Sequence, residues 1–255
     1  MKKYGFLYLF FIFYDVKIVY TQFMRLDRFL CETAAVSRSE AKAYIKGGRV
    51  TVDGIIVRSG DVKVDPEKSK VSFDGIDLKY EQFVYFMLNK PAGFVSATKD
   101  AGKTVIDLLM SENRDDLFPV GRLDKDTTGL LIITNDGDLG HHLTSPKHGI
   151  LKKYLVKIAH SLSEADTSAL SEGLDIGNGE RSGKATVEVI SDDYVYITVS
   201  EGKFHEIKRM LKAVGNEVLE LKRVSMGGVA LDESLKEGEY RRLLPSEIER
   251  LNEHV

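Results

Sequence analysis

The hydrophobic pattern changes along this chain and divides it into two parts. Over residues 25–47, apolar positions recur at the spacing of two short α-helices, and residues 47–48, both glycine, end the second helix. Short apolar strands then alternate with Asp-Gly turns at residues 53–54 and 74–75, as is typical of β-hairpins. We therefore predict a small domain of two helices and β-hairpins over residues 24–80.

The part from residue 83 to residue 255 mixes strands and helices. Apolar, β-branched and aromatic runs predict strands at residues 83–88, 94–97, 130–134, 154–158, 186–190 and 194–199. Helical spacing and end signals predict helices at residues 104–110, 163–173, 205–214 and 246–252. Because several strands follow one another with no helix between them, we predict an α+β fold with a largely antiparallel, mixed sheet flanked by helices, rather than a doubly wound parallel sheet.

The first 23 residues do not share this pattern. Lys2 and Lys3 precede an aromatic-rich run over residues 6–14, which is far shorter than the ~20 apolar residues of a membrane-spanning helix. No small-residue cleavage site follows the run, as a signal peptide would require. We expect residues 1–23 to be an extension outside the native fold, with Met24 as the physiological start; a membrane-surface anchor is the alternative. The remainder is typical of a cytoplasmic protein.

Composition narrows the choice of function. The net charge is −3, so binding to nucleic acid would require a local basic face. The single cysteine, Cys31, allows no internal disulfide and no multi-thiolate metal site. His141, His142 and His148 have no carboxylate or cysteine at metal-binding spacing. We therefore predict no metal site.

A local basic face is present on the second predicted helix. Arg38, Lys42 and Lys46 are spaced four residues apart and form one stripe, and Arg49 follows the helix. Such a stripe would neutralise RNA phosphates, although charge stripes are more often solvated helix faces. The string MRLDRFLCETAAVSRSEAKAYIKGGRVTVDG around it resembles the RNA-binding domain first seen in ribosomal protein S4. That resemblance implies that Arg38, Lys42, Lys46 and Arg49 bind structured RNA.

A second motif carries the candidate chemistry. In GRLDKDTTGLLIITNDG, Asp124 lies in a turn-rich loop that leads into an apolar strand, a common setting for functional residues. Its chemistry alone leaves a turn-capping aspartate as the alternative. The motif, however, resembles the signature of pseudouridine synthases, specifically the branch known as RsuA. Matching strings occur at residues 85–98, 152–158, 200–216 and 220–231.

The resemblance implies roles for individual residues. Asp124 corresponds to the nucleophile, Tyr154 to the tyrosine that contacts the target base, and Lys208 to the basic partner of the nucleophile. Arg122 corresponds to an RNA-binding arginine that fills the space of the flipped uridine. Glu206 and Phe204 depart from the family pattern, which more often has glutamine and tyrosine there.

The implied activity is the isomerisation of a specific uridine to pseudouridine in 16S ribosomal RNA, with no cofactor. The expected partner is 16S RNA or a small-subunit assembly intermediate, and the enzyme is expected to be a monomer that binds no membrane. Two alternatives remain: a synthase of the same family that acts on large-subunit 23S RNA, and a non-catalytic RNA-binding or ribosome-assembly factor.

Overall fold

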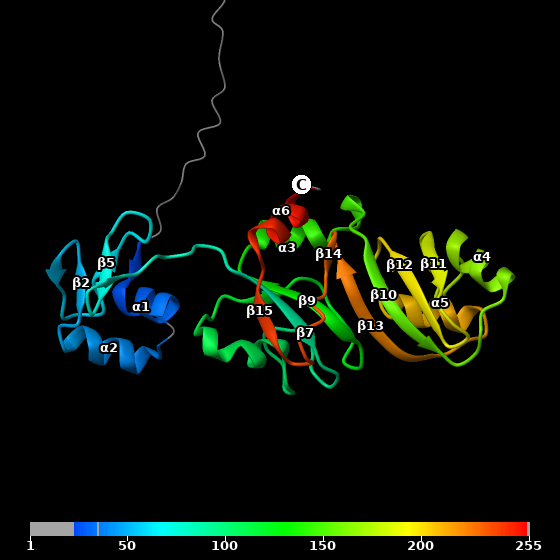
Figure 1. The fold of residues 1–255 in the computed structure, drawn as a ribbon, viewed down its shortest axis with the longest axis horizontal. Coiled ribbons are helices and arrows are strands. Elements are labelled where there is room, and N and C mark those ends of the chain that lie inside the picture. The colour runs from blue at the N-terminus through cyan, green and yellow to red at the C-terminus, as the bar shows by residue number, and fades with distance from the viewer. Residues whose placement is uncertain (1–22, 35, 254–255) are drawn as a thin grey trace, which may run out of the picture. The chain divides into compact units, whose positions relative to one another are not determined.

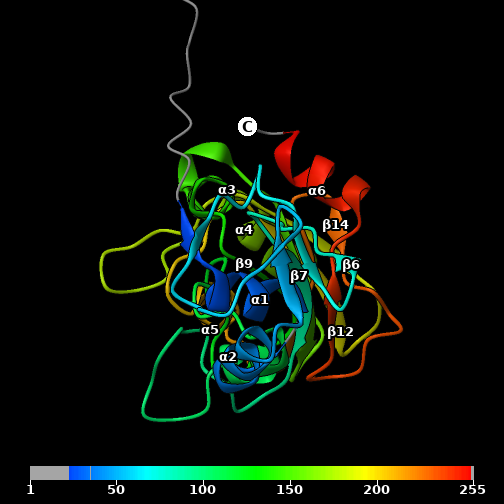
Figure 2. The same cartoon turned by 90° about the vertical axis from the view of Figure 1, so that its left-hand side faces the viewer.

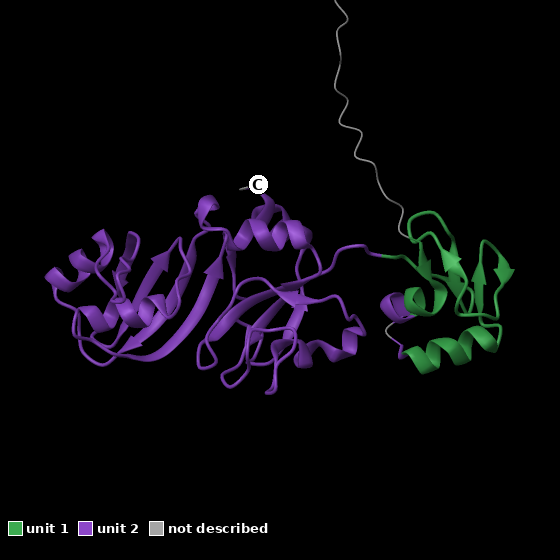
Figure 3. Ribbon diagram, turned by 180° about the vertical axis from the view of Figure 1, so that it is seen from behind, with its two compact units in different colours: residues 1–30, 38–80 green, residues 31–37, 81–255 purple. Residues whose placement is uncertain are grey.

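The computed structural model describes residues 23–34 and 36–253 and divides the chain into two compact units. The first unit comprises residues up to 30 together with 38–80, and the second comprises residues 31–37 and 81–255 (Figure 3). The expected N-terminal extension lies outside the described residues, apart from Phe23. None of the helices within 23–34 and 36–253 is long and apolar enough to cross a membrane.

The first unit contains the second predicted helix, the first turns of the first predicted helix, which continues into residues of the second unit, and a small sheet. The helices are α1 (Leu26–Ala34) and α2 (Arg38–Lys46). The sheet has the order β3-β2-β5-β6 and comprises β2 (Val50–Val52), β3 (Ile55–Ile56), β5 (Val71–Phe73) and β6 (Ile76–Asp77). Both Asp-Gly turns have positive φ at the two central residues, which is the conformation of tight hairpin turns. One strand pair was not predicted: β1 (Met24–Arg25) with β4 (Lys63–Val64).

The second unit is built on a nine-stranded sheet (Figure 1). Its main path runs β11-β12-β10-β13-β9-β7-β15, while β14 pairs with β13 and β8 pairs with β9. The strands are β7 (Tyr85–Lys90), β8 (Phe118–Pro119), β9 (Thr128–Thr134), β10 (Lys152–Ile158), β11 (Ala185–Val189), β12 (Tyr194–Val199), β13 (Val218–Met226), β14 (Val229–Ala230) and β15 (Tyr240–Arg242). The pairing of β9 with β13 is the one parallel contact among the described strands, so the predicted α+β class is confirmed.

The helices of this unit pack on two faces of the sheet. They are α3 (Gly137–Thr144), α4 (Glu164–Glu172), α5 (Glu206–Ala213) and α6 (Pro245–Asn252), with 3-10 helices η1 (Val105–Glu112) and η2 (Pro146–His148). Strands β7 and β9 are buried on both faces, and their alternate residues join two different core clusters. One cluster contains side chains of α4 and α5; the other contains side chains of α3 and α6, which are both drawn in the upper part of Figure 1 and Figure 2.

Two local predictions are wrong. The predicted strand 94–97 forms only one isolated bridge, between Val95 and Thr104. Within that segment the Ser96 hydroxyl bonds both the backbone N–H and the carbonyl of Leu123, so the segment is tied to a loop by a side chain rather than by a ladder. The predicted α-helix 104–110 is instead the 3-10 helix η1.

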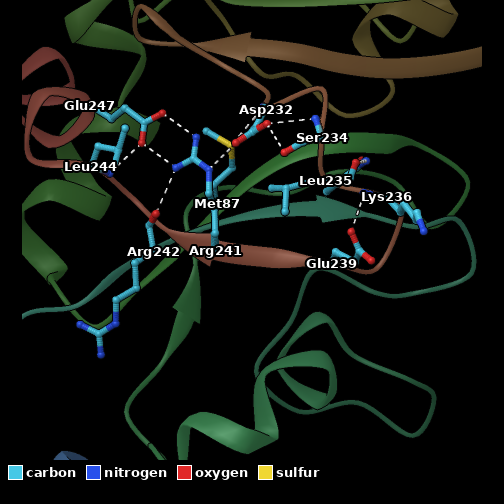
Figure 4. Close-up of polar contacts among 11 residues, drawn as sticks. Met87, Asp232, Ser234, Leu235, Lys236, Glu239, Arg241, Arg242, Leu244 and Glu247 are labelled. Carbon is cyan, nitrogen blue, oxygen red and sulfur yellow. Dashed lines mark hydrogen bonds and ion pairs between the residues drawn. The ribbon is translucent and has the colours of Figure 1, made fainter.

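The edge strand β15 is anchored through one arginine (Figure 4). Arg241 donates from Nε to Asp232 at 2.6 Å and from its two terminal nitrogens to Glu247 at 2.8 and 2.9 Å. Glu247 in turn accepts from the backbone N–H of Leu244 at the start of α6. The guanidinium therefore joins the edge of the sheet to the C-terminal helix and to the loop after β14.

Candidate active site

The loop with the GRLD motif joins β8 to β9, and a buried lysine donates hydrogen bonds to its backbone carbonyls. Lys90, at the end of β7, is fully buried, and its ammonium donates to the carbonyls of Asp124 at 3.0 Å and Thr127 at 2.8 Å. It also reaches the carbonyl of Pro91 at 3.1 Å. Burial lowers the pKa of Lys90 to about 8, and the nearby carboxylates of Asp126 and Asp124 oppose that change. The ammonium is therefore retained at neutral pH and fixes the backbone that presents Asp124.

The Asp124 carboxylate points at two basic side chains of the segment that starts α5. Its Oδ2 lies 3.0 Å from Nζ of Lys208, and its Oδ1 lies 3.5 Å from Nε2 of His205. The side chains of Asp124 and Lys208 are each 24% exposed, so they are partly desolvated but still reachable from solvent. The ion pair with Lys208 therefore holds the Asp124 carboxylate in a fixed position at the surface of a pocket.

Lys208 is shared between two carboxylates. Its Nζ also lies 2.6 Å from Oδ1 of Asp126, whose side chain is 74% exposed. Burial lowers the pKa of Lys208, but the hydrogen bonds with Asp126 and Asp124 outweigh this effect and raise the pKa above its usual value. The hydrogen bond from Lys208 lowers the pKa of Asp126 in the same way. Lys208 is thus a permanent cation at neutral pH.

Tyr154 lines the same pocket from the sheet side. It lies on β10, is 9% exposed, and its hydroxyl has no hydrogen-bond partner among the described residues. Arg122, Thr127 and Ile207 also line the pocket. The structure therefore brings Asp124, Tyr154, Lys208 and Arg122 together, although they come from a loop, a strand and a helix.

The two halves of this pocket meet where β9 pairs with β13. Asp124 precedes β9, whereas Tyr154 lies on β10 and Lys208 on α5, on the other side of that pairing. Gly129 and Arg223 are partners across it. Arg223 is 2% exposed, and its Nε donates to the carbonyl of Leu130 at 2.7 Å. The distance between the carboxylate and its partners therefore depends on this parallel contact.

Two residues of the site had no role in the sequence-based prediction. Lys90 lies in the string YFMLNKPAGFVSAT and His205 in SEGKFHEIKRMLKAVGN, but nothing in either string shows that they face Asp124. Glu206, which departs from the family pattern, is 6% exposed and accepts a hydrogen bond from the backbone N–H of Lys203. Burial raises the pKa of its carboxyl group. Glu206 is therefore a largely buried acid group that also lines the pocket.

The predicted basic stripe lies in the first unit. Arg38, Lys42 and Lys46 are exposed on α2. Arg49 is held differently: it forms an ion pair with Asp74, and its guanidinium lies 4.3 Å from the ring centre of Tyr44 and 4.8 Å from that of Phe73. Arg49 therefore also has a structural role, because it joins the exit of α2 to a hairpin turn. In the part of the chain that the structure describes, no group of three or more histidine, cysteine or acidic side chains could hold a metal ion.

Comparison with known proteins gives a consistent result. The family model for RNA pseudouridylate synthase matches residues 84–213, and the S4 domain model matches residues 24–69. The chain is 45% identical over 236 residues to a protein of Bacillus subtilis described as the uncharacterized RNA pseudouridine synthase YtzG, covering 90% of this chain and 99% of that protein. It is 43% identical over 228 residues to the ribosomal small subunit pseudouridine synthase A of Escherichia coli, covering 88% and 98% of the two chains.

A solved structure agrees with these matches. The crystal structure of a pseudouridylate synthase superposes with a TM-score of 0.63 at 41% sequence identity, covering 89% of this chain and 99% of the other. Both the family model and the relatives span the loop of Asp124 and the segment of Lys208. This chain belongs to the RNA pseudouridylate synthase family and carries an S4 domain ahead of its synthase domain.

Proposed function

We propose that this enzyme converts a uridine of small-subunit ribosomal RNA to pseudouridine, with Asp124 acting at C1′ of the target ribose. The observation that carries the proposal is the pairing of Asp124 with Lys208 at 3.0 Å, in a pocket that Tyr154 also lines. A carboxylate held in position by an ion pair at the edge of a pocket is suited to attack on, or proton removal from, a sugar.

The reaction requires the uridine to leave the RNA stack, because its glycosidic bond is otherwise inaccessible. Asp124 then assists the cleavage of the bond between C1′ and N1, either by attack at C1′ or by removal of a ribose proton. The freed uracil rotates and forms a bond from its C5 to C1′, after which C5 loses its proton and N1 gains one. Tyr154, which lines the same pocket, is proposed to contact the base and to accept the C5 proton. Substrate and product contain the same atoms, so the scheme needs no oxidant, nucleotide or metal.

The choice of small-subunit RNA is supported by the relatives, several of which are described as ribosomal small subunit pseudouridine synthase A. The exposed stripe of Arg38, Lys42 and Lys46 on the S4 domain is proposed to bind RNA phosphates, as is the exposed Arg122 at the pocket. Activity as a monomer in the cytoplasm, on 16S RNA or on a small-subunit assembly intermediate, completes the proposal.

The decisive experiment is the release of tritium from RNA that contains 5-tritiated uridine, with small-subunit and large-subunit ribosomal RNA supplied separately, naked and in assembly intermediates. Asp124→Asn preserves the size and capping ability of the side chain, so a merely structural Asp124 would tolerate it. We expect Asp124→Asn to reduce turnover below detection, with folding and RNA affinity unchanged. The control Asp126→Asn changes a neighbouring carboxylate that also contacts Lys208 and should retain most of the activity.

Each other outcome has a definite meaning. Substantial turnover by Asp124→Asn would contradict its assigned role. Release from large-subunit RNA alone would favour the 23S alternative. RNA binding by the parent enzyme without any release would favour a non-catalytic factor.

A further inference from the structure

Beside the catalytic pocket, two aromatic rings form an exposed stack. Phe204 and His205 have ring centroids 3.8 Å apart and planes inclined by 21°. Phe204 is 73% exposed, so while His205 covers one face of its ring, the other face is open to solvent. Single exposed apolar residues are common on protein surfaces, so exposure alone identifies no site. Here, however, His205 of this pair also lies 3.5 Å from the carboxylate of Asp124.

The backbone holds this stack in an unusual conformation. His205 has φ of +51°, the left-handed region that residues other than glycine rarely adopt, and it is the residue that precedes α5. The carbonyl of Phe204 accepts a hydrogen bond from Arg209, whose guanidinium also bonds the carbonyls of Ile176 and Gly177. Strained backbone that the surroundings enforce is concentrated at functional sites. The strain here points the edge of His205 at Asp124, at 3.5 Å, and leaves Phe204 facing outward.

On the basis of the proposed function, we propose that the open face of Phe204 is a stacking site for the nucleobase next to the target uridine. Flipping the uridine out of the RNA removes a stacking partner from its neighbour. Unstacked RNA bases commonly bind to flat aromatic side chains. Phe204 offers such a surface one ring away from the His205 edge that contacts Asp124.

The base bound there is not the one that reacts. A base on the open face of Phe204 is separated from His205 by the Phe204 ring itself, whereas Asp124 contacts the edge of His205. The reacting uridine must place its C1′ at Asp124, in the pocket that Tyr154 lines. The two positions therefore suit adjacent nucleotides of one strand.

The test uses short RNAs that contain the uridine modified by the parent enzyme, with the natural neighbours or with an abasic nucleotide on the 5′ or the 3′ side. We expect Phe204→Ala to lower kcat/KM for the natural RNA by about 5- to 150-fold, the effect of removing one stacked base. The parent enzyme should show a similar decrease on one of the two abasic RNAs, and Phe204→Ala should show no further decrease on that RNA. Phe204→Tyr, which keeps the aromatic face, should behave like the parent.

Met110→Ala is the matched control, because Met110 is also 73% exposed but lies on η1 and does not line the pocket. It should leave kcat/KM unchanged. Two results would overturn the stacking site while leaving the proposed function intact. One is a kcat/KM of Phe204→Ala on the natural RNA within about twofold of that of the parent. The other is a decrease relative to the parent that is equally large on the natural RNA and on both abasic RNAs. Absence of tritium release by the parent enzyme would instead overturn the proposed function and this inference with it.

Discussion

Gly129→Ala should be the most informative substitution outside the candidate catalytic residues. Gly129 is the second residue of β9 and has φ of +98°, and it pairs with Arg223 in the parallel contact that joins the two halves of the sheet. A Cβ added at Gly129 would lie 2.2 Å from the Arg223 carbonyl oxygen and 2.8 Å from the Arg223 nitrogen. Both atoms belong to backbone, so they can give way only if the strands move apart.

The expected cost has two parts. A residue other than glycine at this φ costs about 1–3 kcal/mol in backbone strain. Forcing an extra methyl group into a closed contact costs about 1–3 kcal/mol more. The sum, about 2–6 kcal/mol, is a large part of the 5–15 kcal/mol by which a typical domain is stable. Because the contact lies between Asp124 on one side and Lys208 and Tyr154 on the other, turnover should fall even in the fraction that remains folded.

Gly238→Ala is the matched control, since Gly238 has φ of +87° but a Cβ there would meet nothing within 4 Å. It should cost only the strain, about 1–3 kcal/mol. Urea unfolding followed by far-ultraviolet circular dichroism measures both variants, because the chain has no tryptophan to serve as a fluorescent probe. Tritium release then compares their activity under folding conditions. If Gly129→Ala were no less stable and no less active than Gly238→Ala, the pairing of β9 with β13 would not control the site.

Three further predictions concern charge. Lys208→Met removes the ion pair with Asp124, and if that pair acts in the proposed reaction, kcat should fall by at least about tenfold, or about 1.4 kcal/mol. Tritium release measures the rate, and a decrease of less than about twofold would refute the proposed role of Lys208. Simultaneous replacement of Arg38, Lys42 and Lys46 by glutamine should weaken RNA binding. The slope of the logarithm of the binding constant against the logarithm of the salt concentration should become shallower by about 0.7–0.9 for each phosphate that is no longer neutralised. An unchanged slope would show that the stripe is merely a solvated helix face. Hydrogen bonds from Ser234 and Arg241 lower the pKa of Asp232 to about 2, and Arg241 also lowers that of Glu247 below its usual 4.5. These carboxylates therefore stabilise the fold above about pH 4.5 and lose that contribution as the pH falls toward 2. In urea titrations at several pH values, Arg241→Met should make the free energy of unfolding fall less steeply with decreasing pH. A decrease as steep as the parent's would contradict the role of Arg241 in lowering these two pKa values.

Local signals in the sequence predicted the elements whose ends are set by short-range chemistry. Helix α4 begins after Ser163, whose side chain caps the backbone of Asp166, and it ends at Gly173, as capping rules require. The Asp-Gly turns of the first unit were predicted because both central residues tolerate positive φ. Strand β12 was predicted with its observed limits from its run of apolar, aromatic and β-branched residues, and alternate residues of this strand are buried in the structure.

The elements that the sequence missed depend on distant partners. Strand β13 carries Arg223 where an apolar residue would be expected, and this arginine is buried because its Nε finds the carbonyl of Leu130 on a strand far away in the sequence. The predicted strand 94–97 fails for a similar reason, since Ser96 bonds the backbone of Leu123. A local pattern cannot show that a polar side chain will find its partner in the tertiary structure.

The candidate site likewise has features that the sequence predicted and features that only the tertiary structure showed. The sequence by itself determined the family, the two domain types and the residues to consider, because the GRLD motif, Tyr154 and Lys208 are recognisable as strings. The resemblance also implied that Lys208 pairs with Asp124, and the structure places the two groups 3.0 Å apart. Only the tertiary structure decided that His205 faces the same carboxylate and that the ammonium of Lys90 binds the backbone of the Asp124 loop. The physical reason is that ion pairs and hydrogen bonds act over a few ångströms. Residues far apart along the chain reach that distance only in the folded sheet, Lys90 through the pairing of β7 with β9, and His205 and Lys208 across the pairing of β9 with β13.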